Sequence, residues 1–216
     1  MYKFVSIKDN PMNEIGSLTA VEPLLDYFKK RGYALNDKEK ALVQEKFHSR
    51  LYRKRQYILQ EGDICTQFNF VIRGCLRTYN VDKKGNIHIL QFGTENYWIN
   101  DLGSFHGMKP SVLNIDALED TVVLQITRED LISLYQQSAI FERVFRVLIE
   151  NGFIHLQERL LQNISSTAEE RYESFLKLYP HLINRISQVQ IAAFLGVTPE
   201  FLSRLRNQRS KTPRNS

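Results

Sequence analysis

The period of the hydrophobic pattern changes near residue 127, and this change constrains the fold more than any other feature of the sequence. Between residues 51 and 127, apolar residues alternate with others, as at Phe68, Phe70 and Ile72. A period of two is typical of β-strands. Glycine-containing turns separate the runs, and the segment 82–86 joins two of them as a hairpin. Many short antiparallel strands predict a jelly-roll barrel.

The spacing of apolar residues is helical on both sides of this region. Near the N-terminus, Asn36 stands three residues before Glu39, which is the spacing of a capping box at the start of a helix. After the strands, we expect one long helix over 136–164. Its apolar positions lie mostly three or four residues apart and include Phe141, Phe145, Leu148, Gly152 and Leu156. This helix either packs on its own barrel or forms a seam between two subunits, and its length and large aromatics favour the homodimer.

The stretch from Arg185 to Asn207, RISQVQIAAFLGVTPEFLSRLRN, predicts two short helices joined by a tight turn. Ser187 can cap the first helix, and Gly196 permits the turn. Thr198 can cap the second helix, whose first turn tolerates Pro199 because a missing N–H costs nothing there. The alternative is an ordinary helical hairpin with solvated charges.

The outer face of the second helix is suited to a DNA major groove. Arginine can donate two hydrogen bonds to guanine and glutamate can accept one from cytosine, so this face holds both kinds of base reader. Further basic side chains would meet phosphates. The expected DNA-binding residues are Ser187, Gln188, Thr198, Pro199, Glu200, Ser203, Arg204, Arg206, Arg209 and Lys211.

Charge and cysteine content agree with a nucleic-acid partner and exclude other classes. The 216 residues include 29 Lys and Arg against 24 Asp and Glu, and no Asp or Glu follows Arg204. Two cysteines, Cys65 and Cys75, cannot build a zinc framework, and we interpret both as small buried residues. No apolar run is long enough to span a bilayer and no secretory signal is apparent, so we expect a cytoplasmic protein without a membrane partner.

Three segments of the sequence point to a known family: ILQEGD from Ile58 to Asp63, FNFVIRGCLRTY from Phe68 to Tyr79, and LGVTPEFLSRLR from Leu195 to Arg206. Through them the sequence resembles the Crp/Fnr family of bacterial transcription regulators. The resemblance implies an α+β fold with three parts. These are a helical N-terminus with a sensor barrel like a cyclic nucleotide-binding domain (1–135), a dimerisation helix (136–164) and a helix-turn-helix, winged-helix-like DNA-binding domain (165–216).

By the same resemblance, Glu200 and Arg204 correspond to the family's base readers, and Ser187 to its phosphate contact. Pro199 replaces a residue that is often basic in the family. The partners implied are double-stranded DNA, a second copy of the chain and, for an activator, RNA polymerase.

The sensor region departs from the family's nucleotide-binding pattern. Pro110-Ser111 stands where an Arg-Ser pair is expected, and the Gly-Glu pair is absent. Losing the arginine removes the strongest partner of a cyclic phosphate, so we expect no tight cyclic AMP binding. The candidates for contacts with an effector are Trp98, Ser111 and Asn114, and the identity of the effector is unknown. We predict no cofactor and no metal.

Enzymatic function is not expected. The sequence contains no G-x-S-x-G elbow, P-loop or H-E-x-x-H motif, and it lacks the His-x-His set of metal-dependent small barrels. No catalytic residue is therefore assigned. The remaining alternative to a regulator is a ligand-binding or protein-interaction module with degenerate DNA binding.

Overall fold

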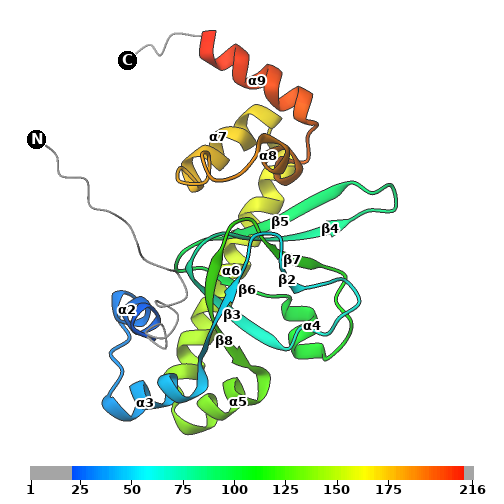
Figure 1. Cartoon of the computed structure of the whole chain (residues 1–216). Helices are drawn as coiled ribbons and strands as arrows, with labels where there is room; N and C mark the ends of the chain where they lie inside the picture. The colour runs from blue at the N-terminus through cyan, green and yellow to red at the C-terminus, as the bar shows by residue number, and fades with distance from the viewer. Residues whose placement is uncertain (1–20, 212–216) are drawn as a thin grey trace, which may run out of the picture.

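A computed structural model describes residues 21–211, with side chains as far as residue 208. Two helices open the described chain, a barrel follows, and helices close it (Figure 1). The strands are β1 (His48–Tyr52), β2 (Tyr57–Leu59), β3 (Gln67–Arg73), β4 (Leu76–Val81), β5 (Ile87–Gly93), β6 (Trp98–Ile99), β7 (Asn114–Ala117) and β8 (Thr121–Thr127). The helices are α2 (Glu22–Lys30), α3 (Asp37–Lys46), α4 (Leu102–Gly107), α5 (Arg128–Gln137), α6 (Ala139–Ser165), α7 (Ala168–Leu178), α8 (Gln188–Leu195) and α9 (Pro199–Lys211).

The strands form two four-stranded antiparallel sheets, which confirms the jelly-roll prediction. One sheet has the order β1-β8-β3-β6, and the other has the order β2-β7-β4-β5. The hairpin predicted at residues 82–86 joins β4 to β5, and Gly85 there has a φ of 83° that suits glycine. The carboxylate of Asp82 accepts hydrogen bonds from the amides of Lys84 and Asn86, which fixes the turn.

The N-terminal helices begin as the sequence predicts. The side chain of Asn36 accepts a hydrogen bond from the amide of Glu39, whose carboxylate accepts one from the amide of Asn36. This capping box starts α3. Helix α2 has no side-chain cap and is held by packing, because Leu24, Tyr27 and Phe28 are buried.

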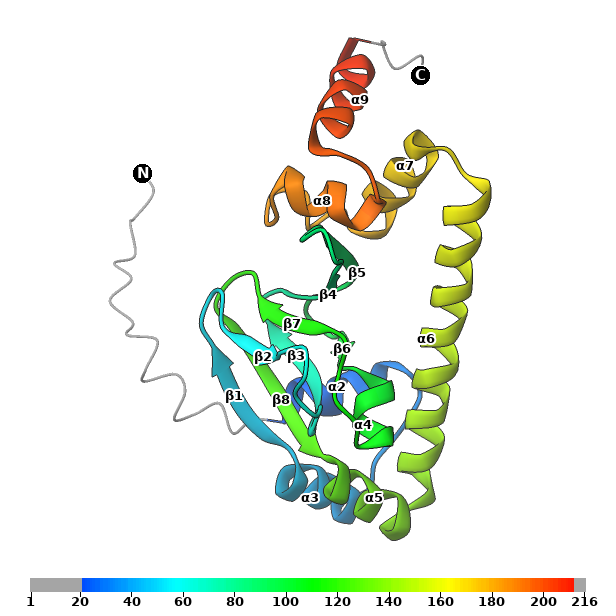
Figure 2. The same ribbon diagram turned by 90° about the vertical axis from the view of Figure 1, so that its right-hand side faces the viewer.

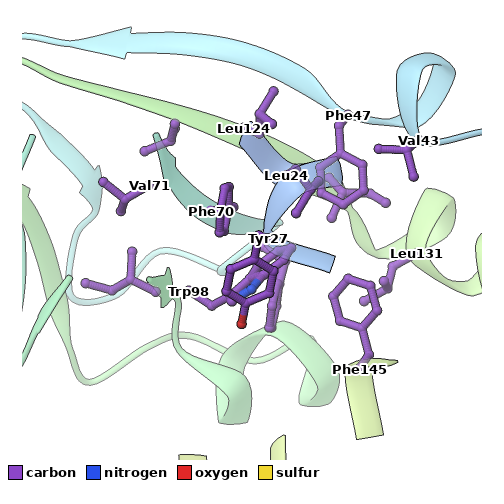
Figure 3. Close-up of a cluster of buried hydrophobic side chains, with 14 of the residues drawn as sticks. Leu24, Tyr27, Val43, Phe47, Phe70, Val71, Trp98, Leu124, Leu131 and Phe145 are labelled. Carbon is purple, nitrogen blue, oxygen red and sulfur yellow. The ribbon is translucent and has the colours of Figure 1, made fainter. Parts of the chain in front are cut away.

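Aromatic side chains from distant segments meet in the barrel core. Trp98 lies 5.0 Å from Phe70 and 5.2 Å from Phe145, measured between ring centroids. Tyr27 contacts the same group from α2 (Figure 3). Offset and edge-to-face ring pairs add to the free energy gained from apolar burial. The first half of α6 is therefore fixed to the barrel of its own chain.

This packing corrects part of the expected dimer seam. Phe141 and Phe145 are 0% and 3% exposed within one chain, so neither is available to a second subunit. Leu148 is half-buried against the same core, whereas Gly152 and Leu156 are exposed. At 3.6 residues per turn, the first four of these residues lie on the barrel-facing side of α6. The apolar spacing correctly predicted a buried face of this helix, but the barrel of the same chain covers that face, and not a second subunit.

Helix α6 runs along the barrel and continues past it to the C-terminal helices (Figure 2). Its 27 residues span about 40 Å. Between residues 165 and 211 the structure contains helices and no strand, so the described C-terminal unit, for which DNA binding is predicted, consists of α7, α8 and α9. No helix of the described chain is both long and apolar enough to cross a membrane.

Candidate nucleic-acid interface

Both predicted caps of the C-terminal motif are present. The Ser187 hydroxyl accepts a hydrogen bond from the amide of Gln190, whose side chain in turn accepts one from the amide of Ser187. Gly196 ends α8 with a φ of 68°, and Thr198 accepts from the amide of Phe201 at the start of α9. The caps leave the Ser187 O–H free to donate, as a contact to a phosphate requires.

Helix α9 buries one side and exposes the other. Leu202 and Leu205 pack inward against α8, with Val197 half-buried beside them. The outward residues are Thr198, Pro199, Glu200, Ser203, Arg204 and Arg206, all exposed. The helix projects away from the barrel (Figure 2), and no residue of the described part of the chain covers these six side chains.

The outward charges of α9 are not neutralised within residues 21–208. Arg204 and Arg206 have no carboxylate within ion-pair distance in that range, and Glu200 pairs with no cation there. Arg204 lies 5.9 Å from the ring centroid of Phe201 on the same helix. The described face therefore keeps its donors for an external anion. Arg209 and Lys211 belong to α9, but their side chains lie outside the described part.

Gln188 opens α8 and is half-buried, and its Oε1 atom has no hydrogen-bond partner among the described residues. The acceptor oxygen of the Gln188 side chain is therefore buried, and its amino group is the part that can donate a hydrogen bond to a phosphate. Ser187 and Gln188 thus lie next to each other at the start of α8, the helix that precedes α9.

A second apolar cluster, which we call the domain junction, joins the C-terminal unit of α7, α8 and α9 to the barrel. Ile89 and Phe92 of β5 are buried against residues of α7 and α8. Phe92 and Phe194 have ring centroids 5.3 Å apart. This contact could not be predicted from the sequence, since the partners are about a hundred positions apart and each looks like an ordinary core residue.

Ion pairs surround the domain junction. The guanidinium of Arg185 donates two hydrogen bonds of 2.9 Å to Glu95 and one to Glu119. Burial alone would raise the pKa of Glu95, but these hydrogen bonds outweigh it and lower the pKa to about 2. Arg185 comes from the segment before α8 and both glutamates come from barrel loops, so three charges tie the two parts together.

The three residues proposed to contact an effector have internal partners. Trp98 is in the aromatic core. The Ser111 hydroxyl donates to Asp101 at 2.6 Å, and the Asn114 side chain accepts from the amide of Glu61 at 3.0 Å. All three are under 9% exposed.

Asp101 is the internal acceptor for hydrogen-bond donors next to Pro110-Ser111. One of its oxygens accepts from the amide of Ser104 at the start of α4, and the other accepts from Ser111. A carboxylate of the chain therefore uses the donors nearest to Pro110-Ser111. This arrangement agrees with the expectation that cyclic AMP does not bind tightly here.

Neither cysteine is exposed, and no metal site is found in residues 21–211. Burial raises the pKa of Cys65, and it raises the pKa of Cys75 to about 12, so both thiols are protonated at neutral pH. The described residues contain no group of three or more His, Cys, Asp or Glu side chains that could hold a metal ion.

Comparison with known proteins gives a consistent picture. Residues 49–138 match the family model "Cyclic nucleotide-binding domain". FixK2 from Bradyrhizobium japonicum is 22% identical, with 76% of this chain and 84% of that one aligned at a TM-score of 0.67. A putative transcriptional regulator of the Crp/Fnr family from Eubacterium rectale is also 22% identical, over 82% of this chain and 84% of that one, at a TM-score of 0.64.

The regulator CLP from Xanthomonas campestris, described as responsive to c-di-GMP, is 17% identical over 81% of this chain and 92% of its own, at a TM-score of 0.60. No curated protein matches the sequence. The chain thus contains a domain of the cyclic nucleotide-binding family and has the fold of transcription regulators of the Crp/Fnr family.

Proposed function

We propose that the protein is a transcription regulator that binds a palindromic DNA operator as a homodimer. The observation that carries the proposal is the outer face of α9, where Arg204, Arg206 and Glu200 are exposed and unpaired within residues 21–208. In a helix-turn-helix unit, this face of the second helix reads base edges. Arg204 would donate to a guanine, and Glu200 would accept from a cytosine. Such a protein would act in the cytoplasm, where its DNA lies.

The second half of α6 supports the homodimer. Ile149, Phe153, Leu156, Leu160 and Ile164 are spaced four, three, four and four residues apart, and their exposed fractions run from 38% to 76%. We call these five residues the α6 stripe. Five large apolar residues on one helix face resemble the seam of a coiled coil. Burying them against a second copy would place two α9 helices on one side of the dimer.

The stripe and the barrel-facing side of α6 lie on different faces of the helix. With 3.6 residues per turn, Leu160 lies about 60° around the helix from Phe145 and about 120° from Leu148, roughly a quarter of a turn from their mean direction. A dimer along the stripe would therefore leave the barrel packing unchanged. Leu156 belongs both to the dimer seam predicted from the sequence and to the α6 stripe. In the seam proposed here, Phe153, Leu160 and Ile164 take the place of Phe141 and Phe145, which the barrel buries.

Selection of the purified full chain against a random duplex pool at near-physiological salt tests the proposal. We expect enrichment of a palindrome whose half-sites lie one helical turn apart, about 34 Å. A flat sequence profile would contradict it and would favour an interaction module with degenerate DNA binding. Contact with RNA polymerase is the finer part of the proposal, and transcription from a promoter carrying the selected site measures it.

A cyclic nucleotide is not the effector in this proposal. The Asp101 carboxylate already accepts the hydrogen bonds of Ser104 and Ser111, and a bound phosphate would be placed beside it. The negative charges of the phosphate and of the Asp101 carboxylate would repel each other, which disfavours binding. Calorimetry with cyclic AMP is expected to show no micromolar binding to the purified protein.

A further inference from the structure

A cavity of about 80 Å³ lies where the distal half of α6 meets α7, α8 and the loop before β6. Its lining draws on the barrel through Tyr97, on α6 through Arg159, on α7 through Arg171 and Phe175, and on α8 through Phe194. The cavity therefore touches the sensor barrel, the long helix and the DNA-binding unit at once. None of these residues belongs to the outer face of α9 or to the α6 stripe.

Arg159 enters this cavity without an acidic partner. Its Nη2 atom donates to the backbone oxygens of Ile89 at 2.9 Å and of Phe194 at 3.1 Å, and its guanidinium carbon lies 4.0 Å from the centroid of the Phe194 ring. No carboxylate of the described residues lies within ion-pair distance of it. Burial lowers the pKa of Arg159, as expected for a cation taken out of water without a counter-charge.

Arg171 brings a second guanidinium to the same cavity. Its Nη1 atom donates to the backbone oxygen of Ser166 at 2.9 Å, whereas its Nε atom is buried and has no hydrogen-bond partner among the described residues. Leaving a buried charged donor unsatisfied costs free energy, and native structures rarely do so unless something else satisfies it. Two arginines with unused donors in one cavity favour an anion.

The other residues that line the cavity restrict the class of anion that it can bind. Phe175, Tyr179 and Phe194 supply aromatic surface, and their ring centroids are 5.4 to 5.9 Å apart. Glu158 also lines the cavity, is exposed and pairs with His155 at 3.3 Å. A carboxylate at the rim repels a dianion such as phosphate more than a monoanion. The cavity thus suits a planar monoanion with an apolar ring.

We propose that this cavity binds a small aromatic carboxylate, with Arg159 and Arg171 holding the carboxylate and the Phe and Tyr rings holding the aromatic part. A guanidinium fork matches the planar geometry of a carboxylate. Because the site is built from three parts of the chain, a bound ligand stabilises the arrangement in which those parts meet. It shifts the position of α9 only to the extent that it binds this arrangement better than others. This regulatory part rests on the proposed DNA binding.

Binding is measured first without DNA, so that its outcome does not depend on the proposed function. The full chain is titrated with benzoate, 4-hydroxybenzoate, phenylacetate and, separately, inorganic phosphate, by calorimetry and by NMR of the aromatic side chains. We expect at least one aromatic carboxylate to bind with a dissociation constant below about 1 mM, and phosphate to bind at least about tenfold more weakly.

Three variants locate the site. Arg171→Gln removes the second cation and is expected to weaken carboxylate binding by about tenfold or more. Arg146→Gln is the matched control, because Arg146 is an exposed arginine of α6 that pairs with Glu150 away from the cavity, and it leaves binding unchanged. Glu158→Gln removes an exposed repelling charge and is expected to tighten binding a few-fold, which keeps the test valid even if Arg171→Gln unfolds.

The proposal is overturned if the wild-type chain binds none of the three carboxylates up to about 10 mM, if phosphate binds as tightly as they do, or if Glu158→Gln leaves the affinity unchanged. With binding established, the selected DNA is titrated with and without the carboxylate. A change of at least about threefold in DNA affinity supports the regulatory part, and no change overturns that part alone. Failure to bind any DNA contradicts the proposed function and leaves the binding result standing.

Discussion

The two halves of α6 have opposite surroundings. In the first half, Phe141, Val144 and Phe145 are buried by the barrel of the same chain. In the second half, Phe153, Leu160 and other apolar residues of the α6 stripe are exposed. The packing of the first half is therefore explained by one chain, whereas the second half has a large apolar face that residues 21–211 leave exposed to water. Exposed apolar surface of this extent is typical of interaction sites.

The two halves of α6 also differ in the kind of contact that fixes them in place. The first half is anchored to the barrel by apolar and aromatic contacts. The second half approaches the domain junction, where ion pairs and buried arginines accompany the apolar contacts. Charged contacts depend on pH and salt far more than apolar ones do. We therefore expect the DNA-binding unit to respond to solution conditions that leave the barrel unchanged.

The largest expected effect is a loss of folding stability when the first half of α6 is changed. Replacing Phe145 by Ala removes a ring that is 3% exposed and contacts Phe68, Trp98 and Tyr135. Truncating a buried Phe costs about 3–5 kcal/mol. Urea unfolding followed by circular dichroism measures it, and the loss should persist at every protein concentration. A loss under about 1 kcal/mol would mean that this half is not part of the barrel core.

The second half is tested by a matched pair of leucines. Leu160→Glu places a charge within the α6 stripe and is expected to weaken dimerisation by at least about 100-fold, or about 2.7 kcal/mol. Leu161→Glu is the control, because Leu161 has a similar exposed fraction, 64% against 57%, but lies about 100° around the helix. Analytical ultracentrifugation measures both. Equal effects of the two substitutions would contradict the seam proposed here.

The DNA-binding unit at the far end of the second half should lose base selectivity when Arg204 is replaced by Ala. The expected cost is about 1–3 kcal/mol at one base pair of the half-site and little elsewhere. Competition binding against every single-base variant of the selected operator measures it. As a comparison, Lys211→Ala should weaken binding evenly across sequences and reduce its salt dependence. A change of base preference in the Lys211 variant would show that the roles are wrongly assigned.

The smallest effect concerns the ion pairs of the domain junction. The pKa of Glu95 is lowered to about 2, so its contribution is fully present above the unfolded pKa of about 4.5 and is lost as the pH falls toward 2. Glu95→Gln should cost about 1–2 kcal/mol at pH 7, because Glu95 and its partner Arg185 are 37% and 25% exposed and solvent screens the pair.

Urea unfolding of the wild type and of Glu95→Gln at pH 7 and pH 3 measures this contribution. The difference between the two proteins should shrink at the lower pH, because at pH 3 the unfolded wild-type chain, in which the pKa of Glu95 is about 4.5, binds a proton that the folded chain takes up only near pH 2. A difference that stays constant between pH 7 and pH 3 would indicate that Glu95 contributes through packing and not through its charge.

The sequence predicted the elements better than it predicted their partners. Local signals such as the Asn36 and Ser187 caps, Gly196 and the hairpin at Asp82 are confirmed, because each depends on neighbours a few residues away. The barrel was predicted from the period of two and is confirmed. Phe141 and Phe145 were assigned to the wrong partner, because an apolar helix face looks the same whether a barrel or a second chain covers it.

The contacts that were missed are long-range and polar. Arg185 is 90 positions from Glu95, and Arg159 meets the backbone of Ile89 across 70 positions. An arginine in a helical segment looks like an ordinary surface residue, and only the fold shows that Arg159 is withdrawn from solvent without an acid. The outward face of α9 was easier to predict, since its exposure follows from helical period alone.

The most direct test of the central claim varies the spacing of the two half-sites. The purified chain is bound to the selected palindrome and to a version with about five extra base pairs between the half-sites, which rotates them by half a helical turn. A dimer joined along the α6 stripe predicts a loss of affinity of at least about 100-fold for the longer spacing. Equal affinity for both duplexes would mean that each α9 binds independently, and it would contradict the dimeric regulator proposed here.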